Sequence, residues 1–124
     1  MKILTPLYKL IDLRAAYRFL DKKLPDFLLP TAFNWFYKFS VDPFDVEKSD
    51  YEAHKFNLIV KMVREVQVKN ALDIGCGTGI LTEKISPFCE KILGLDFSDD
   101  AIKLAKKRCA THQNMQFLAT DIRH

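Results

Sequence analysis

The stretch Ala71-Leu72-Asp73-Ile74-Gly75-Cys76-Gly77-Thr78-Gly79 decides the fold of this chain. Its first part, with Asn70, is a short apolar run bounded by turn residues, which is typical of a strand buried on both faces. The glycines that follow lack Cβ atoms, so the backbone can turn sharply and a ligand can lie on main-chain N–H groups. Thr78 is expected to open a helix whose N-terminal end favours an anionic group. The stretch therefore predicts a strand, a glycine turn and a helix that form a nucleotide-type binding corner.

The spacing of the glycines decides which nucleotide fits this corner. A dinucleotide fingerprint has the pattern G-x-G-x-x-G, and the two possible registers place Ile80 or Thr82 where the third glycine should be. The pattern here is D-x-G-x-G-x-G, with Asp73 at the end of the strand. Such a carboxylate would repel a pyrophosphate and favours a ligand that carries positive charge. The missing third glycine thus argues against a nicotinamide-dependent oxidoreductase.

Two further strands are predicted downstream, each followed by an acid. Residues 91–95 form a second apolar run closed by Asp96, near the spacing of about 20 residues at which an acid meets ribose hydroxyls. Residues 115–119 form a third run, followed by Asp121. Ser98 is expected to cap a helix between these two strands. This alternation of strands and helices predicts right-handed crossovers and a parallel sheet.

Taken together, these residues resemble motif I and the following strands of the class I S-adenosylmethionine-dependent methyltransferases, over about residues 50–124. The resemblance implies an α/β fold with a Rossmann-like three-layer parallel sheet, S-adenosyl-L-methionine as the cofactor, and no metal. It also implies a set of cofactor-binding residues: Asp73, Gly75 and Gly77 at the methionine end, with Cys76 and Gly79 in the same loop, Asp96 at the ribose hydroxyls, Phe97 at an adenine face, and Asp121 with the Ile122 N–H at the adenine amino group.

The resemblance extends less fully to the rest of the fold and to the acceptor. The family's sheet has seven strands in the order three-two-one-four and onward, so the sheet is expected to be truncated after the third strand, leaving residues 70–74 at an edge. Asp42-Pro43-Phe44, followed by Tyr51-Glu52 and Lys55, resembles a segment of small-molecule N-methyltransferases of the nodulation type. A small-molecule acceptor is expected on that ground, while no catalytic base is identified.

A helix directly before the first strand carries two candidate substrate contacts. Ser49 and Glu52 form a capping box for this helix. In the resembling family, an aromatic residue or an acid at the start of this helix often faces the methyl-transfer site. Tyr51 and His54 are therefore candidates for substrate contact, and the alternative is that they are ordinary first-turn residues.

The N-terminal part divides the chain into two expected regions. Residues 1–48 are expected to be a helical and aromatic-rich extension, and residues 49–124 the N-terminal half of a methyltransferase domain. Thr5 and Pro6 begin an amphipathic helix that Pro25 ends, and its basic face leaves open a membrane surface, a partner or solvent as its neighbour. Residues 25–48 are predicted to be irregular, because prolines interrupt a dense aromatic cluster there.

Composition excludes several other classes of protein. The net charge of +3 is too small to indicate nucleic-acid binding. The three cysteines and three histidines lack metal-ligand spacing. The odd number of cysteines suggests no disulfide framework and suits a reduced cytoplasm, and each cysteine is expected to be a small buried residue. No apolar run approaches the roughly 20 residues of a membrane span. An alternative function remains, a truncated, non-catalytic cofactor-binding or scaffold module that needs a partner chain or associates with itself through the exposed sheet edge.

Overall fold

The computed structural model describes residues 25–123 of the 124-residue chain, so the predicted first helix lies outside the described residues. The elements follow one another in alternation along the chain. In order they are η2 (Asp26–Leu28), α2 (Leu29–Phe39), α3 (Asp50–Val66), β1 (Asn70–Ile74), α4 (Ile80–Ile85), η3 (Ser86–Phe88), β2 (Lys91–Asp96), α5 (Asp99–Arg108) and β3 (Met115–Ala119).

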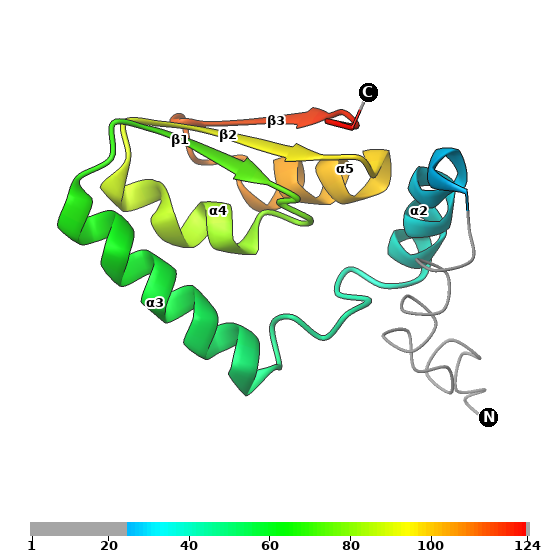
Figure 1. Cartoon of the computed structure of the whole chain (residues 1–124), viewed down its shortest axis with the longest axis horizontal. Coiled ribbons are helices and arrows are strands. Elements are labelled where there is room, and N and C mark those ends of the chain that lie inside the picture. The colour runs from blue at the N-terminus through cyan, green and yellow to red at the C-terminus, as the bar shows by residue number, and fades with distance from the viewer. Residues whose placement is uncertain (1–24, 124) are drawn as a thin grey trace.

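The three strands form one parallel sheet in the order β1-β2-β3, which confirms the α/β prediction (Figure 1). Leu72 pairs with Leu93, and Ile74 pairs with Leu95, which in turn pairs with Leu118. Since all the strands are parallel, their carboxyl ends meet at one edge of the sheet. The acids predicted at the strand ends are thereby brought to that same edge.

Helices α3, α4 and α5 lie on one side of the sheet (Figure 1). The core between these helices and the strands is apolar and almost free of solvent, because alternate strand residues point into it. Its buried members are Cys76, Ile85, Ile92, Ile102, Ala105, Cys109, Met115 and Phe117. The buried stripe on α5 matches the pattern predicted from the sequence, and Ser98 caps this helix as expected, its Oγ accepting the Ala101 N–H at 3.1 Å.

The opposite face of the sheet is bare among residues 25–123. Leu72 and Ile74 are each 56% exposed and Leu118 is 54% exposed, although all three are large and apolar. β1 pairs with β2 alone in this part of the chain, so its other edge carries no strand. The described residues thus contain one helical layer and the sheet of the three-layer arrangement, and β1 is at the edge, as predicted.

Helix α2 overturns the prediction that residues 25–48 are irregular. Pro30 lies in the first turn, where a residue without an N–H costs no helical hydrogen bond. The buried side chains Leu29 and Phe36 lie seven residues apart, on the face that α2 turns toward the rest of the fold. The spacing of these buried side chains is that of an amphipathic helix, and Pro43 lies after the helix ends.

Two helix starts can be compared with their predicted caps. Ser49 Oγ accepts the Glu52 N–H at 3.3 Å and begins α3, as predicted. The helix after the glycine turn begins at Ile80 and not at Thr78, because Gly79 is its N-cap in a left-handed conformation. Thr78 itself is buried.

No helix among the described residues is long and apolar enough to cross a membrane.

Candidate functional site

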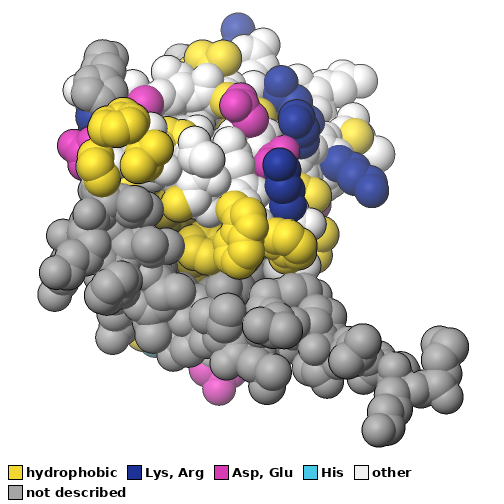
Figure 2. Space-filling model, turned by 90° about the vertical axis from the view of Figure 1, so that its right-hand side faces the viewer, with side chains coloured by type: hydrophobic (Ala, Val, Ile, Leu, Met, Phe, Trp, Pro, Cys, Tyr) yellow, Lys and Arg dark blue, Asp and Glu magenta, His cyan; other side chains and the backbone are white. Residues whose placement is uncertain are grey.

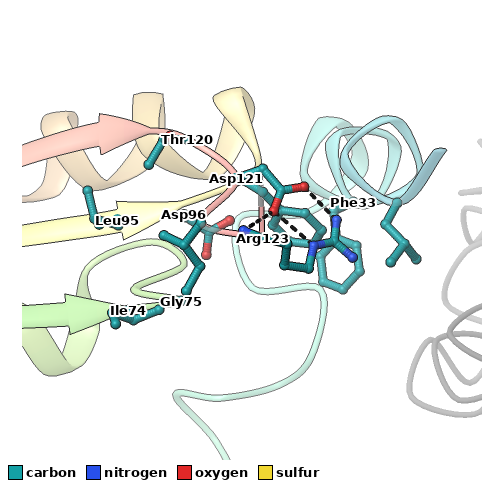
Figure 3. Close-up of a pocket in the computed structure, with 11 residues that line it drawn as sticks. Phe33, Ile74, Gly75, Leu95, Asp96, Thr120, Asp121 and Arg123 are labelled. Carbon is teal, nitrogen blue, oxygen red and sulfur yellow. Dashed lines mark hydrogen bonds and ion pairs between the residues drawn. The ribbon is translucent and has the colours of Figure 1, made fainter. Parts of the chain in front are cut away.

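A pocket of about 290 Å³ lies at the carboxyl edge of the sheet, where all three strands end (Figure 3). The strand ends and the turns after them form its floor, and the start of α2 forms a facing wall. The pocket is lined by Leu29, Phe33, Ile74, Gly75, Leu95, Asp96, Phe97, Thr120, Asp121, Ile122 and Arg123. Ligands of open parallel sheets bind at this edge, so the pocket is the candidate site.

The glycine turn has a left-handed backbone at all three glycines, with φ values of 74° at Gly75, 54° at Gly77 and 80° at Gly79. A Cβ on Gly79 would lie 3.2 Å from the Phe117 ring, so this glycine is required by packing. A Cβ on Gly75 would meet nothing within 4 Å. Gly75 therefore opens onto free space in the pocket, where a ligand can approach the backbone.

The N–H groups of this turn are already hydrogen-bonded within the protein. Gly75 and Cys76 both donate to the Leu95 carbonyl, at 2.8 and 2.9 Å, and Gly79 donates to the Cys76 carbonyl at 3.0 Å. Gly77 donates to Asp96 Oδ2 at 2.9 Å. The expectation that a ligand lies on these N–H groups is thus wrong, because they hold the turn in shape. What the turn offers a ligand is the space above Gly75 and the carboxylates beside it.

Two carboxylates flank the turn, the half-buried Asp73 and the buried Asp96. Asp73 Oδ2 accepts the Thr82 hydroxyl at 2.6 Å. Asp96 is 8% exposed, and its oxygens accept the Ser98 and Gly77 N–H groups, each at 2.9 Å. Burial raises the pKa of both carboxyls, and these hydrogen bonds oppose the rise. The arrangement presents negative charge and acceptor atoms in a desolvated corner.

The third strand ends in a different environment. The Asp121 carboxylate accepts from the side chain of Arg123, with 2.8 Å between Oδ1 and Nε. The Arg123 guanidinium also lies 5.8 Å from the centre of the Phe97 ring and 3.4 Å from Asp26. Ile122 is exposed at the rim. The predicted residues Phe97, Asp121 and Ile122 all line the pocket, and Arg123 joins them.

The structure places the other predicted site residues elsewhere. The Cys76 side chain lies in the core, and burial raises the pKa of its thiol, so only its backbone belongs to the turn. Cys109 is buried and Cys89 is half-buried, in keeping with apolar roles. Tyr51 and His54 are exposed in the first turn of α3 and do not line the pocket. The prediction of Cys76 as a cofactor contact is therefore corrected for its side chain.

Sequence reasoning missed the contribution of α2. Phe33 packs against Phe97 with ring centres 4.7 Å apart and ring planes tilted by 54°. The Tyr37 hydroxyl lies 3.3 Å from the position of a Cβ on Gly77. Burial, and next the charge of Asp96, raise the pKa of this hydroxyl, which keeps it protonated. The signal available was helical spacing within the aromatic cluster, which the prolines obscured.

The family model of Nodulation protein S, NodS, matches residues 38–124. The chain belongs to the NodS family. The match contains both the glycine turn and the Asp42-Pro43-Phe44 segment, so the resemblance to class I S-adenosylmethionine-dependent methyltransferases is confirmed. The matched part begins within α2, so the end of this helix is included in the family pattern.

Individual relatives agree with the family match. Nodulation protein S of Sinorhizobium fredii is 24% identical over 83 residues, which are 66% of this chain and 38% of the relative. A crystal structure of N-methyltransferase NodS from Bradyrhizobium japonicum WM9, in complex with S-adenosyl-L-homocysteine, is 28% identical with a TM-score of 0.61. It covers 65% of this chain and 42% of that one. A ubiquinone biosynthesis O-methyltransferase of Nitrosomonas europaea is 29% identical over 85 residues, 54% of this chain and 36% of that relative. The chain thus spans less than half the length of these relatives.

Proposed function

We propose that this chain provides the S-adenosyl-L-methionine-binding part of a NodS-type methyltransferase that acts on a small-molecule acceptor. The observation that carries this proposal is the pair of carboxylates beside the open backbone of Gly75, the half-buried Asp73 and the buried Asp96, at the ends of adjacent parallel strands. The NodS family match and the structural likeness to a complex with S-adenosyl-L-homocysteine support it.

The residues of the pocket fit the parts of this cofactor. Asp73, which lies two residues before Gly75 and does not itself line the pocket, would hold the positively charged methionine end. Asp96 would accept hydrogen bonds from the ribose hydroxyls, because its two oxygens still have free lone pairs after accepting the Gly77 and Ser98 N–H groups. Phe97 would provide an apolar face for adenine, and Asp121 and the Ile122 N–H would meet its amino edge. For adenine to lie on Phe97, the Arg123 guanidinium has to move off that ring.

The chemistry divides between the cofactor and the protein. The bound cofactor supplies a methyl group on a sulfonium that is already activated for displacement by a nucleophile of the acceptor. The residues of this chain orient the donor and exclude water around it, and both effects lower the barrier without any covalent step on the protein. Tyr37, held protonated beside Gly77, is a hydrogen-bond donor at the same loop.

A small molecule is the proposed acceptor, since this chain belongs to the NodS family and its named relatives include both an N-methyltransferase and an O-methyltransferase. A protein that works in the cytoplasm is part of the same proposal. Nucleic acid is a less suitable acceptor, because the net charge of the chain is only +3.

The bare sheet favours a second candidate function, a non-catalytic cofactor-binding or scaffold module. Leu72, Ile74 and Leu118 are more than half exposed, and the free edge of β1 could pair with another chain. Under this alternative the chain would bind the cofactor without transferring its methyl group.

Calorimetric titration of the intact protein with S-adenosylmethionine, S-adenosylhomocysteine and NAD tests the proposal. We expect both adenosyl ligands to bind and NAD to bind far more weakly, because the carboxylates repel a pyrophosphate. Tighter binding of NAD would contradict the methyltransferase proposal. Transfer of a labelled methyl group to small amines and hydroxyl compounds then separates the enzyme from the scaffold module, which would bind and not turn over.

A further inference from the structure

One polar contact links α2 to the strand end that carries the proposed ribose acceptor. Ser98 Oγ donates to Asn34 Oδ1 at 2.6 Å, and the same oxygen accepts the Asp100 N–H at 3.2 Å. Asn34 thus supplies an acceptor to the N-terminal end of α5 from a helix 60 or so residues earlier in the chain, beside the cap that Ser98 itself provides. The two caps act on the same turn.

This turn also holds the Asp96 carboxylate. The Ser98 N–H donates to Asp96 Oδ1, and the Gly77 N–H donates to Asp96 Oδ2. Ser98 is fully buried, so its hydroxyl has no water to replace a lost partner. A continuous series of hydrogen bonds therefore runs from Asn34 through Ser98 and Asp96 to Gly77.

The neighbours of Asn34 on α2 reach the same site. Phe33 contacts Phe97, and Tyr37, one turn later on the helix, places its hydroxyl against Gly77. One face of α2 is therefore in contact with both loops that would hold the cofactor. This face does more than close the pocket, because it bonds to the groups that set the loop geometry.

We propose that Asn34 is a positioning residue for the adenosyl cofactor, which keeps the Ser98 turn in place and so orients Asp96 toward the ribose hydroxyls. The inference rests on the proposed function, because it assigns the ribose to Asp96. It adds α2 to the cofactor site as an element that controls affinity through the Asn34 side chain.

The pH dependence of binding separates positioning from mere support of the fold. The Ser98 N–H bond lowers the pKa of Asp96, against burial, which raises it. If Asn34 holds Ser98 in place, then its loss weakens that bond and the pKa of Asp96 rises. Ionised Asp96 is the form that accepts from ribose, so the fall in affinity on acidification will begin at a higher pH. Tyr37, Asp73 and Cys76 interact electrostatically with Asp96, and Asp121 and Arg123 line the same pocket. The substitution at position 34 leaves all five of these groups in the protein.

The experiment measures S-adenosylhomocysteine affinity by calorimetry from about pH 4 to pH 8 in the intact protein. Asn34→Leu, which removes the acceptor, is expected to weaken binding about five- to tenfold at pH 8, the cost of one or two hydrogen bonds, and to move the midpoint of the acid fall upward. Asn34→Asp keeps an acceptor oxygen and is expected to stay within about threefold of wild type at pH 8. Thr31→Ala, on the exposed side of α2, is the matched control.

The outcomes are distinguishable. If Asn34→Leu does not fold, Asn34→Ala makes the same test with a smaller change. An unchanged pH midpoint in the folded leucine or alanine variant would overturn the positioning role, even if the melting temperature falls. A wild-type protein that does not bind S-adenosylhomocysteine at all would overturn the proposed function instead.

Discussion

At the scale of single residues, the glycines of the turn set its conformation and the neighbouring aspartates supply its charge. A Cβ at Gly79 would crowd the Phe117 ring, while Gly75 leaves space for a ligand. Asp73 and Asp96 provide the charge, and the partial desolvation of Asp73 and the burial of Asp96 raise the pKa of both carboxyls. Neither carboxylate pairs with a cation among the described residues, where the ion pairs all involve other acids. Such groups weaken the fold and are typical of a binding site.

Asp73→Asn is expected to separate binding from stability. Because burial raises the folded-state pKa of Asp73 above its ordinary value of 3.8, the stability linked to this group is full below that value and is lost as pH rises through the raised pKa. At neutral pH, asparagine avoids the buried charge and can still accept from Thr82, so the melting temperature is expected to hold or rise. Affinity for S-adenosylmethionine is expected to fall roughly tenfold or more, the cost of a lost charged contact.

Thermal melts of the ligand-free protein between about pH 4 and pH 8, with calorimetry at pH 7.5, measure both effects. Asp99→Asn is the matched control, because Asp99 is exposed in the first turn of α5 and does not line the pocket. A variant that melts lower at every pH and binds as wild type would show that Asp73 is a structural residue.

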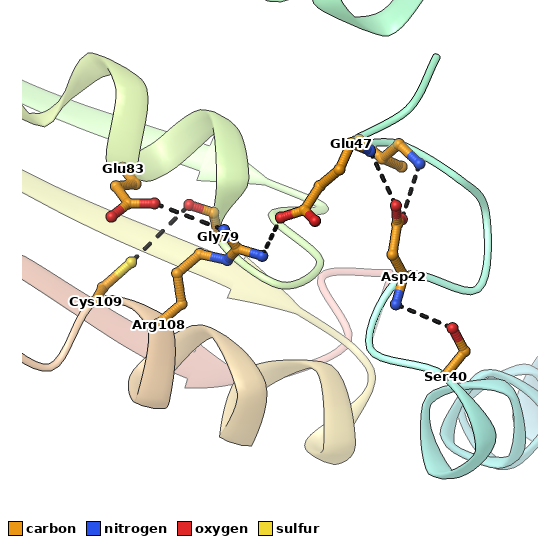
Figure 4. Close-up of polar contacts among 8 residues, drawn as sticks. Ser40, Asp42, Glu47, Gly79, Glu83, Arg108 and Cys109 are labelled. Atoms are coloured by element: carbon orange, nitrogen blue, oxygen red, sulfur yellow. Dashed lines mark hydrogen bonds and ion pairs between the residues drawn. The ribbon is translucent and has the colours of Figure 1, made fainter.

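At the scale of elements, the segment between α2 and α3 is tied to the helices beneath the sheet by Arg108 (Figure 4). Arg108, in the last turn of α5, pairs with Glu47 of this segment and lies 3.8 Å from Glu83 of α4. The Asp42 carboxylate holds the same segment from within, accepting the Val46 and Glu47 N–H groups at 2.8 and 2.9 Å. The segment between α2 and α3 has no helix or strand of its own, and these carboxylate contacts hold it in place.

Arg108→Ala is expected to destabilise the fold slightly, by up to about 1 kcal/mol, because partly exposed ion pairs contribute little. Its Nε is buried without a hydrogen-bond partner among the described residues, and losing that unpaired donor offsets part of the cost. Denaturant unfolding at low and at about 1 M salt measures the loss, with Lys107→Ala, an exposed cation one residue away, as the control. A loss that is the same at both salt concentrations would mean that packing of the arginine stem, and not charge, holds the segment.

At the scale of the whole molecule, apolar surface is exposed on several sides of the described fold. Leu72, Ile74 and Leu118 lie on the bare face of the sheet. Trp35 and Phe39 of α2, whose rings meet edge to face, are about half exposed. Figure 2 looks onto the end of the molecule at which α2 lies and shows hydrophobic side chains gathered there in patches. Apolar side chains gathered on a protein surface are typical of sites of association, so these surfaces predict that the chain associates.

The 124-residue chain expressed by itself is expected to associate, because among the described residues β1 has a free edge and one face of the sheet is bare and apolar. It is also expected to lack methyl transfer activity. The double variant Leu72→Lys with Leu118→Lys, which places charge on that face, is expected to shift the chain toward smaller species. Light scattering with size exclusion measures both forms, and Leu58→Lys on the exposed side of α3 is the control. A monodisperse wild-type monomer that transfers methyl groups would contradict this prediction.

The sequence by itself determined the strands, the glycine turn and the acids at the strand ends. These features are local, since a short apolar run bounded by turn residues, glycines in a turn and a carboxylate at a strand end can all be recognised from consecutive residues. The predicted strands at residues 70–74 and 115–119 have the observed bounds, and the second extends one residue further, to Asp96. The cap at Ser49 was predicted for the same local reason.

Only the tertiary structure decided what surrounds the turn. The N–H groups expected for a ligand are taken by Leu95 and Asp96, which lie about 20 residues away in the sequence and come close through β1–β2 pairing. Prolines mask the helical spacing of α2, so the sequence predicts irregular structure there. The contacts of α2, Asn34–Ser98 and Phe33–Phe97, join parts of the chain that no local pattern connects. Side-chain contacts across such separations depend on how whole elements pack, and that information is distributed over the sequence as a whole.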